Sequence, residues 1–235
     1  MNSSDNLEDG GLEDGGLPCP ARAAQGAAIV AKLGRNPMVS RVANDHLDVF
    51  WRMDFASPEE CAQMRAIIDA GAVPSTLFPG NEGPEYRTSH SCNLEPEDPL
   101  VARLSDRIAA LMGIDPSHGE TLQGQRYQPG QEYREHCDWF STASAYWPQM
   151  RAQGGQRCWT AMIYLNAVEE GGETHFPYLG FMVPPREGML LLWNNLDHAG
   201  VPSAYSAHMA RPVVRGSKYV LTKWFRERPW VHPTA

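Results

Sequence analysis

A histidine and an aspartate stand two residues apart in the stretch YREHCDWF, as His136 and Asp138. On a strand, side chains at i and i+2 point to the same face, so an imidazole and a carboxylate would project together while Cys137 faces away. The pair is open to two interpretations: a partly exposed pair without chemistry, or two ligands of a metal site. A third ligand elsewhere in the chain would decide between them.

The candidates for a third ligand are the histidines that follow, His175, His198, His208 and His232. Two histidines and one carboxylate leave open positions on an octahedral metal, which is the arrangement of non-haem Fe(II) oxygenases. A zinc hydrolase fits less well, because a zinc site gives no reason for a nearby cation that binds a carboxylate. His208 is followed by such a cation, Lys218.

Lys218 begins the strand-like run KYVLTKW. Alternation places four of its residues on one face: Lys218, Val220, Thr222 and Trp224. A cation and a hydroxyl on one face can bind a carboxylate together, and a keto acid that chelates iron has a far carboxylate to bind. Lys218 is therefore the candidate anchor for such an acid.

Other residues compete for these two roles. His198 lies in the turn-like NNLDHAG and remains a rival ligand, whereas His175 is expected to be a packing residue. Arg211 and Arg215 could replace Lys218 as the anchor, although both precede the strand. The residue pattern alone leaves these alternatives open.

Composition limits the class of protein. The chain has 235 residues, 42% hydrophobic and 20% charged, which suits one domain with a sizeable core. Residues 1–25 are rich in glycine and acid, so we expect a disordered acidic tail, followed by a single domain over 26–235. The formal charge of −8 gives no basic surface for phosphate backbones, so we expect no nucleic-acid partner.

Cysteine use and hydropathy bear on the compartment. The five cysteines are an odd number without C-x-x-C spacing, which predicts neither a disulfide framework nor a zinc knuckle. The first residues lack the basic and apolar regions of a secretory signal. No apolar run is long enough to span a membrane, and no basic amphipathic stretch suggests a membrane surface. We therefore expect a cytoplasmic protein without a membrane partner.

Two helices and a series of strands must position these residues. Residues 57–71 predict a helix, with Ser57 as N-cap, Pro58 at its first position and Glu60 completing a capping box. An apolar face at helical spacing predicts a second helix over about 98–113. Strand-like runs bounded by Gly and Pro clusters occupy 46–55, 120–128, 157–166, 188–195 and 217–227. This order predicts an α+β, mainly β fold: a double-stranded β-helix (jelly roll) core braced by N-terminal helices.

The chain resembles the prolyl 4-hydroxylase group of 2-oxoglutarate- and Fe(II)-dependent oxygenases, and we expect a bacterial member. Four segments carry the resemblance in order: RYQPGQEYREHCDWF, GGQRCWTAMIYLNAVEEGGETHFP, GMLLLWNNL and AHMARPVVRGSKYVLTKWF. EYRTSHSCNL and SDRIAALMGI extend it to about residues 50–230. The resemblance implies the cofactors Fe(II), 2-oxoglutarate and O2, with ascorbate as a candidate reductant. It also implies hydroxylation that releases succinate and CO2.

Within this resemblance, residue roles follow position by position. The iron ligands would be His136, Asp138 and His208, and Lys218 would bind the distal carboxylate of 2-oxoglutarate. Further contacts to 2-oxoglutarate would come from Tyr127, Thr174, Tyr164 and Thr222. The positions that contact a peptide substrate in this group are Tyr133, Arg157 and Trp224. Strict alternation would send Arg157 and Tyr164 to opposite faces of one strand, so a bulge is required for both to reach the site.

One residue departs from the group. Collagen-type and plant-type relatives commonly have Trp-Ile-His where this chain has Trp224, Phe225 and Arg226. Arg226 shares a face with Lys218, so we expect it to point toward the substrate mouth and to favour an acidic residue beside the target. The stretch 141–155 is long and ends in glycines, which predicts a loop that closes over the substrate.

The leading prediction is a hydroxylase of prolyl residues in a peptide or protein. An oxygenase that acts on a free amino acid or another small metabolite is the alternative, because a fold does not fix the substrate. A non-catalytic jelly-roll binding protein is a third class, which the complete ligand set and Lys218 argue against. The sequence indicates no oligomeric state.

Overall fold

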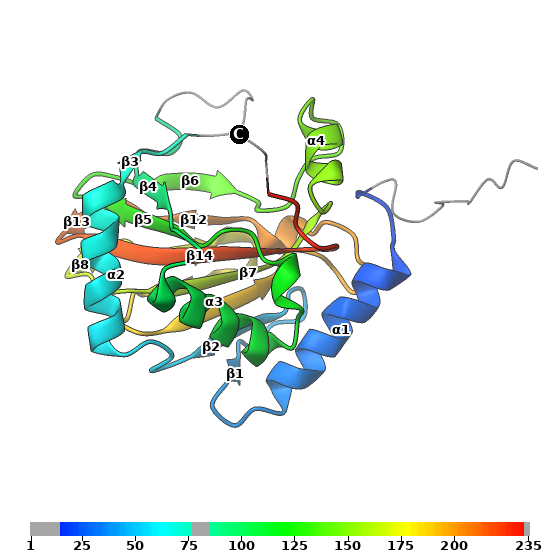
Figure 1. Cartoon of the computed structure of the whole chain (residues 1–235). Coiled ribbons are helices and arrows are strands. Elements are labelled where there is room, and N and C mark those ends of the chain that lie inside the picture. The colour runs from blue at the N-terminus through cyan, green and yellow to red at the C-terminus, as the bar shows by residue number, and fades with distance from the viewer. Residues whose placement is uncertain (1–14, 77–84, 233–235) are drawn as a thin grey trace, which may run out of the picture.

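The computed structural model describes residues 15–76 and 85–232 (Figure 1). Its largest element is an eight-stranded antiparallel sheet with the strand order β1-β2-β11-β7-β14-β5-β4-β3. The strands of this sheet are β1 (Ser40–Arg41), β2 (Val49–Arg52), β3 (Val73–Pro74), β4 (His90–Asn93), β5 (Gln123–Tyr127), β7 (Arg157–Tyr164), β11 (Leu190–Asn194) and β14 (Lys218–Arg226). β7 and β14 form its centre.

A second sheet faces the first, with the strand order β10-β9-β12-β6. Its strands are β6 (Tyr133–His136), β9 (Thr174–Phe176), β10 (Phe181–Val183) and β12 (His208–Ala210). A two-stranded ribbon adds β8 (Glu170–Gly171) and β13 (Val213–Arg215). Met162 and Val220 of the large sheet share one apolar cluster with Phe176 and Ala210 of the small sheet. The sequence-based prediction of a mainly β, jelly-roll core is thus confirmed.

Helices cover the other face of the large sheet (Figure 1). The long helices are α1 (Pro20–Gly34), α2 (Pro58–Gly71) and α3 (Pro99–Met112), and short 3₁₀ turns are η1 (Pro116–His118), η2 (Pro177–Leu179) and η3 (Ala204–Ser206). Alternation along β7 divides the two cores. Trp159 and Ile163 join the helix-side cluster, whereas Met162 and Tyr164 join the cluster between the sheets. The site must therefore lie on the even-numbered face of β7.

The two predicted helices are confirmed, and the first has the predicted capping box. Ser57 Oγ accepts from the backbone N–H of Glu60, and the Glu60 carboxylate accepts from the N–H of Ser57, as a capping box requires. α3 is capped by Asp98 and ends at Gly113, whose φ of +73° suits glycine. These helices form where the sequence shows both a cap and an apolar face.

The predicted disordered tail over 1–25 is wrong for its second half. Residues 1–14 lie outside the described residues, but α1 begins at Pro20. Arg22 is buried, pairs with Glu227 at 2.9 Å and donates from Nε to the carbonyl of Gly200. Composition missed this helix because its anchor is a buried arginine whose partners lie at the far end of the chain. The single domain over 26–235 stays a prediction.

Two other segments differ from their predictions. The strand predicted over 46–55 is reduced to β2. The loop predicted over 141–155 contains a short helix, α4 (Trp147–Ala152), whose Trp147 and Met150 pack against Phe140. The segment is thus anchored by a small apolar cluster of its own. No helix in the described part of the chain is long and apolar enough to cross a membrane.

Candidate active site

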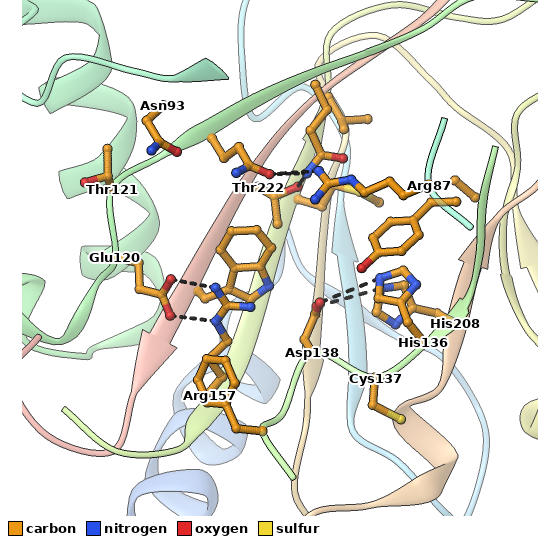
Figure 2. Close-up of a pocket in the computed structure, with 18 of the residues that line it drawn as sticks. Arg87, Asn93, Glu120, Thr121, His136, Cys137, Asp138, Arg157, His208 and Thr222 are labelled. Carbon is orange, nitrogen blue, oxygen red and sulfur yellow. Dashed lines mark hydrogen bonds and ion pairs between the residues drawn. The ribbon is translucent and has the colours of Figure 1, made fainter. Parts of the chain in front are cut away.

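The predicted metal ligands meet where the strands of the small sheet pair. β12 lies antiparallel to β6 and brings His208 opposite His136, and Asp138 follows the end of β6. Candidate ligand atoms of the three residues all lie within 4.8 Å of one another. The Asp138 carboxylate is 3.8 Å from Nε2 of His136 and 3.7 Å from Nε2 of His208 (Figure 2). The side chain of Cys137 points away from them.

This arrangement decides among the histidines left open by the sequence. His208 is buried beside the pair, whereas His198 is exposed on a turn and lies outside the cluster. His175 lies on β9 next to Thr174, half-buried, and is paired with Met182 and Met209. The structure therefore makes His208 the candidate third ligand.

Backbone carbonyls set the tautomer of both imidazoles. Nδ1 of His136 lies 2.8 Å from the carbonyl of Arg134, and Nδ1 of His208 lies 2.9 Å from the carbonyl of Ser206. A carbonyl only accepts, so Nδ1 carries the proton and Nε2 keeps its lone pair for a metal. Burial, and then the neighbouring His208, lower the pKa of His136 to about 3, so its ring is neutral. Two imidazole nitrogens and a carboxylate are a donor set that fits Fe(II).

The three candidate ligands line a cavity of about 440 Å³, and Lys218 lines it too. Lys218 is only 1% exposed. Among the described residues it has no hydrogen bond or ion pair, and its Nζ lies 5.3 Å and 5.7 Å from the ring centroids of Tyr127 and Tyr164. Burial lowers the pKa of Lys218 to about 7, against the opposing effect of Glu173. A buried cation without a counter-charge fits the carboxylate of a ligand.

Three of the four other residues assigned to 2-oxoglutarate line the same cavity as Lys218. Tyr127, Thr174 and Thr222 line the cavity. Tyr164 does not line it. Its hydroxyl instead donates to Thr174 Oγ1 at 2.7 Å and so orients a side chain that does. Gln125, which the sequence did not indicate, accepts from the Tyr127 hydroxyl and donates to Thr222 Oγ1.

A further part of the cavity wall is aromatic and cationic. The Tyr133 ring stacks on His136, with 3.5 Å between centroids. The Arg157 guanidinium lies 4.0 Å from the Trp224 ring centroid and 4.8 Å from that of Phe140. The residues predicted to contact a substrate are thus brought together beside the candidate metal centre.

A bulge resolves the parity conflict on β7. The strand pairs Trp159 with Phe225 and then Arg157 with Arg226, so Cys158 is the extra residue. The bulge turns Arg157 to the cavity face that Tyr164 also occupies. Arg157 thereby reaches the cavity, whereas Tyr164 contacts it only through its hydrogen bond to Thr174.

The predicted role of Arg226 is corrected. Its side chain lies at the cavity wall but is only 2% exposed, and its Nε donates to Glu120 Oε1 at 2.5 Å. Its Nη1 donates to the carbonyl of Gly155 at 2.6 Å. Arg157 binds the same Glu120 carboxylate through two bonds of 2.6 and 2.7 Å (Figure 2). Burial alone would raise the pKa of Glu120, but the two arginines outweigh it and lower that pKa.

The guanidinium of Arg226 is therefore already engaged inside the protein, and the reason for expecting it to select acidic substrates is lost. Glu120 was missed because nothing in its local sequence distinguishes it from a surface carboxylate. Two arginines on one sheet face, both pointing inward, were the available signal for a buried counter-charge.

Known proteins place this site in a family. Residues 122–226 match the family model described as the 2OG-Fe(II) oxygenase superfamily. The chain is 31% identical over 202 residues to prolyl 4-hydroxylase 13 of Arabidopsis thaliana, covering 77% of this chain and 72% of that protein. It is 37% identical over 179 residues to prolyl 4-hydroxylase subunit alpha-3 of Mus musculus, covering 74% of this chain. The chain spans about a third of the length of that mammalian relative (33%).

Solved structures agree in fold. A viral collagen prolyl hydroxylase of Paramecium Bursaria Chlorella virus-1, bound to 2-oxoglutarate, superposes with a TM-score of 0.62 at 25% identity, over 76% of this chain and 95% of that one. A Trichoplax adhaerens prolyl hydroxylase in complex with a hypoxia inducible factor peptide gives 0.59 at 15% identity, over 88% and 90%, a likeness of fold alone. The chain belongs to the prolyl 4-hydroxylase-like family of 2-oxoglutarate- and Fe(II)-dependent oxygenases.

Proposed function

We propose that this protein hydroxylates prolyl residues in a peptide or protein, with 2-oxoglutarate and O2 as cosubstrates and succinate and CO2 as products. One observation carries the proposal: a buried set of His136, Asp138 and His208 shares a cavity with Lys218, a buried cation that has no partner among the described residues. Neither feature suits a packed core. The histidines and the aspartate suit Fe(II), and the buried cation suits the carboxylate of 2-oxoglutarate.

Different residues of the cavity would bind the metal and 2-oxoglutarate. When bound, iron and 2-oxoglutarate supply the oxidation of an unactivated C–H bond. His136, Asp138 and His208 would hold the metal, and Lys218 with Thr174 would orient the far carboxylate of 2-oxoglutarate. Asp138, His208 and Lys218 are buried, which would limit the access of water to the reacting groups.

A peptide substrate is favoured by the aromatic and cationic part of the cavity wall. Tyr133 and Trp224 offer aromatic faces, and Arg157 offers guanidinium N–H groups. Such a wall can hold an extended proline-containing segment, whose fixed φ lowers the cost of ordering on binding. The relatives named above are prolyl hydroxylases, and one solved relative carries a peptide. Ascorbate as a reductant and a cytoplasmic location complete the proposal as predictions.

Metal analysis and turnover of one pair of variants test the catalytic centre. His208→Ala should lose bound iron and succinate formation, because water must replace one of three protein ligands. His198→Ala is the matched control, since this exposed histidine lies outside the cluster. Normal iron content and turnover in His208→Ala would reject the proposed centre.

A substrate panel tests the peptide. Succinate release and a product heavier by one oxygen should be compared for free proline and proline-containing peptides at equal concentration. We expect the peptides to be hydroxylated faster. Efficient turnover of free proline or another small metabolite, with every peptide inactive, would replace the peptide reading by the small-molecule alternative.

A further inference from the structure

Asp138 is held differently from the two histidines. Each imidazole is fixed by a backbone carbonyl two residues earlier on its own segment, from Arg134 and Ser206. Asp138 lies beyond the end of β6, and its one hydrogen bond among the described residues comes from another sheet: Thr160 Oγ1 donates to Asp138 Oδ2 at 2.7 Å. The orientation of the carboxylate therefore depends on a side chain of β7.

A second side chain fixes the direction of this bond. Asn195 Nδ2 donates to Thr160 Oγ1 at 2.9 Å. A hydroxyl has one proton, and a carboxylate only accepts, so the proton of Thr160 must point to Asp138 and Asn195 must be the donor. The opposite orientation of the Asn195 amide would leave its NH2 group facing away and give Thr160 two competing acceptors.

Asn195 is itself rigidly placed. It is fully buried, its backbone N–H donates to the carbonyl of Cys158 at 2.8 Å, and its carbonyl accepts from Ser203 at 3.0 Å. Its Oδ1 is buried without a hydrogen-bond partner in the described part of the chain. An unpaired buried acceptor is costly, so an amide retained here points to a role for its donor side.

We propose that Thr160, oriented by Asn195, is the positioning residue of the metal-binding carboxylate. Its hydroxyl occupies Oδ2 of Asp138 and so presents Oδ1 to the metal, fixing the side-chain rotamer before metal binds. The inference rests on the metal centre of the proposed function. Groups that orient a metal ligand typically change metal affinity by about 10–100-fold when removed.

Three variants separate positioning from packing. Thr160→Val keeps the shape and removes the hydroxyl, and Thr160→Ser keeps the hydroxyl and removes a methyl group. Asn195→Ala keeps the Thr160 hydroxyl but frees it to rotate. A packing role would be disturbed by the lost methyl group, whereas a positioning role depends on the hydroxyl and its direction.

The test is titration of the metal-free protein with Co(II). Calorimetry and the visible absorption of the bound ion measure binding, and circular dichroism checks the fold. We expect Thr160→Val to bind Co(II) about 10–100-fold more weakly with an altered spectrum, and Thr160→Ser to bind within about threefold of the wild type. Should Thr160→Val not fold, Asn195→Ala, expected to weaken binding about tenfold, tests the same point.

Two results would overturn the proposal while leaving the metal centre intact: wild-type affinity and spectrum in Thr160→Val, or equal losses in Thr160→Val and Thr160→Ser. For an unfolded Thr160→Val, wild-type affinity in Asn195→Ala has the same meaning. If the wild type itself bound no Co(II), the metal centre of the proposed function would be rejected, and this inference with it.

Discussion

The two ends of β14 both bury a cation on the same face of the strand, but they treat its charge differently. Arg226 shares the carboxylate of Glu120 with Arg157 and also binds a backbone carbonyl. Lys218 is as deeply buried, yet among the described residues it has no hydrogen bond or ion pair, and its Nζ faces the rings of Tyr127 and Tyr164. A buried charge with a partner is part of the architecture, whereas one without a partner carries a cost that the carboxylate of a ligand can offset. The contrast separates the wall of the cavity from its ligand anchor.

The largest effect is expected from the removal of Lys218, the candidate anchor of 2-oxoglutarate. Lys218→Met should raise the KM for 2-oxoglutarate by about 100-fold or more, because a buried carboxylate without its charged partner costs on the order of 3–5 kcal/mol. Iron content should stay normal, since Lys218 is not a metal ligand. The measurement is succinate formation against 2-oxoglutarate concentration, with metal analysis of the same protein.

Lys223→Met is the matched control. Lys223 lies on the same strand with its side chain on the opposite face, where its Nζ donates to the backbone carbonyl of Glu120. This variant should leave the KM for 2-oxoglutarate within about threefold of the wild type, below 1 kcal/mol. An unchanged KM in Lys218→Met would show that the anchor lies elsewhere, with Arg211 and Arg215 as the next candidates.

The next largest effect is expected at Glu120, the shared partner of Arg157 and Arg226. Glu120→Gln should lower the free energy of unfolding by about 3–5 kcal/mol, because Arg157 and Arg226 lose their shared counter-charge inside the protein. Lys218→Met should cause no such loss in the metal-free protein, since it removes a buried charge that lacked a partner. Urea denaturation of both variants measures the difference. Equal destabilisation by the two substitutions would contradict the distinction drawn between the two ends.

The third effect is a dependence of stability on pH. Burial lowers the pKa of Lys218 to about 7 in the folded protein, whereas an ordinary lysine titrates near 10.5. Between these values the unfolded chain binds the extra proton, so the free energy of unfolding should rise with pH, by at most about 1.4 kcal/mol per unit. Below pH 7 both states are protonated and Lys218 contributes no slope.

The comparison of wild type with Lys218→Met isolates this contribution. Glu173 is the charged group that acts on Lys218, and the neighbouring Tyr127 and Tyr164 have pKa values raised by burial, which keeps them neutral in this range. Denaturation of both metal-free proteins from about pH 6.5 to about pH 9.5, a range that starts just below the folded-state pKa and stays below the unfolded-state pKa, measures the difference in slope. Parallel curves would mean that Lys218 keeps an ordinary pKa and a partner.

Sequence reasoning succeeded where a short-range rule applies. Period-two alternation put Lys218, Thr222 and Trp224 on one face, and the cavity confirms it. Capping residues located α2, and the spacing of apolar residues located α3. The same alternation revealed a conflict between Arg157 and Tyr164, which the bulge in β7 resolves.

The features that sequence reasoning missed depend on contacts between distant segments. Arg226 was correctly placed on the cavity face, but its partner Glu120 is brought there only by the packing of the segment before β5 against β7 and β14. Thr160 and Asn195 meet through the pairing of β7 with β11. No local sequence pattern specifies which distant segments pair, so the partners of the buried charged and polar groups could not be predicted from the sequence.

The smallest expected effect is the response to charge on the substrate. Because Arg226 is held by Glu120 and Gly155, an acidic residue beside the target proline should gain little, and kcat/KM for paired peptides with Asp or Asn there should differ by less than about threefold, below 1 kcal/mol. Raising the salt concentration should leave this ratio unchanged, whereas a steering charge would be screened. Arg87 is the cavity cation to compare: it binds Gln123 Oε1 at 3.0 Å, lies 4.8 Å from the Tyr133 ring centroid and has no carboxylate partner among the described residues. A preference for Asp of tenfold or more that vanished in Arg87→Gln would assign the recognition of acidic residues to Arg87. A preference that vanished only in Arg226→Gln would contradict the conclusion that Glu120 and Gly155 already satisfy Arg226.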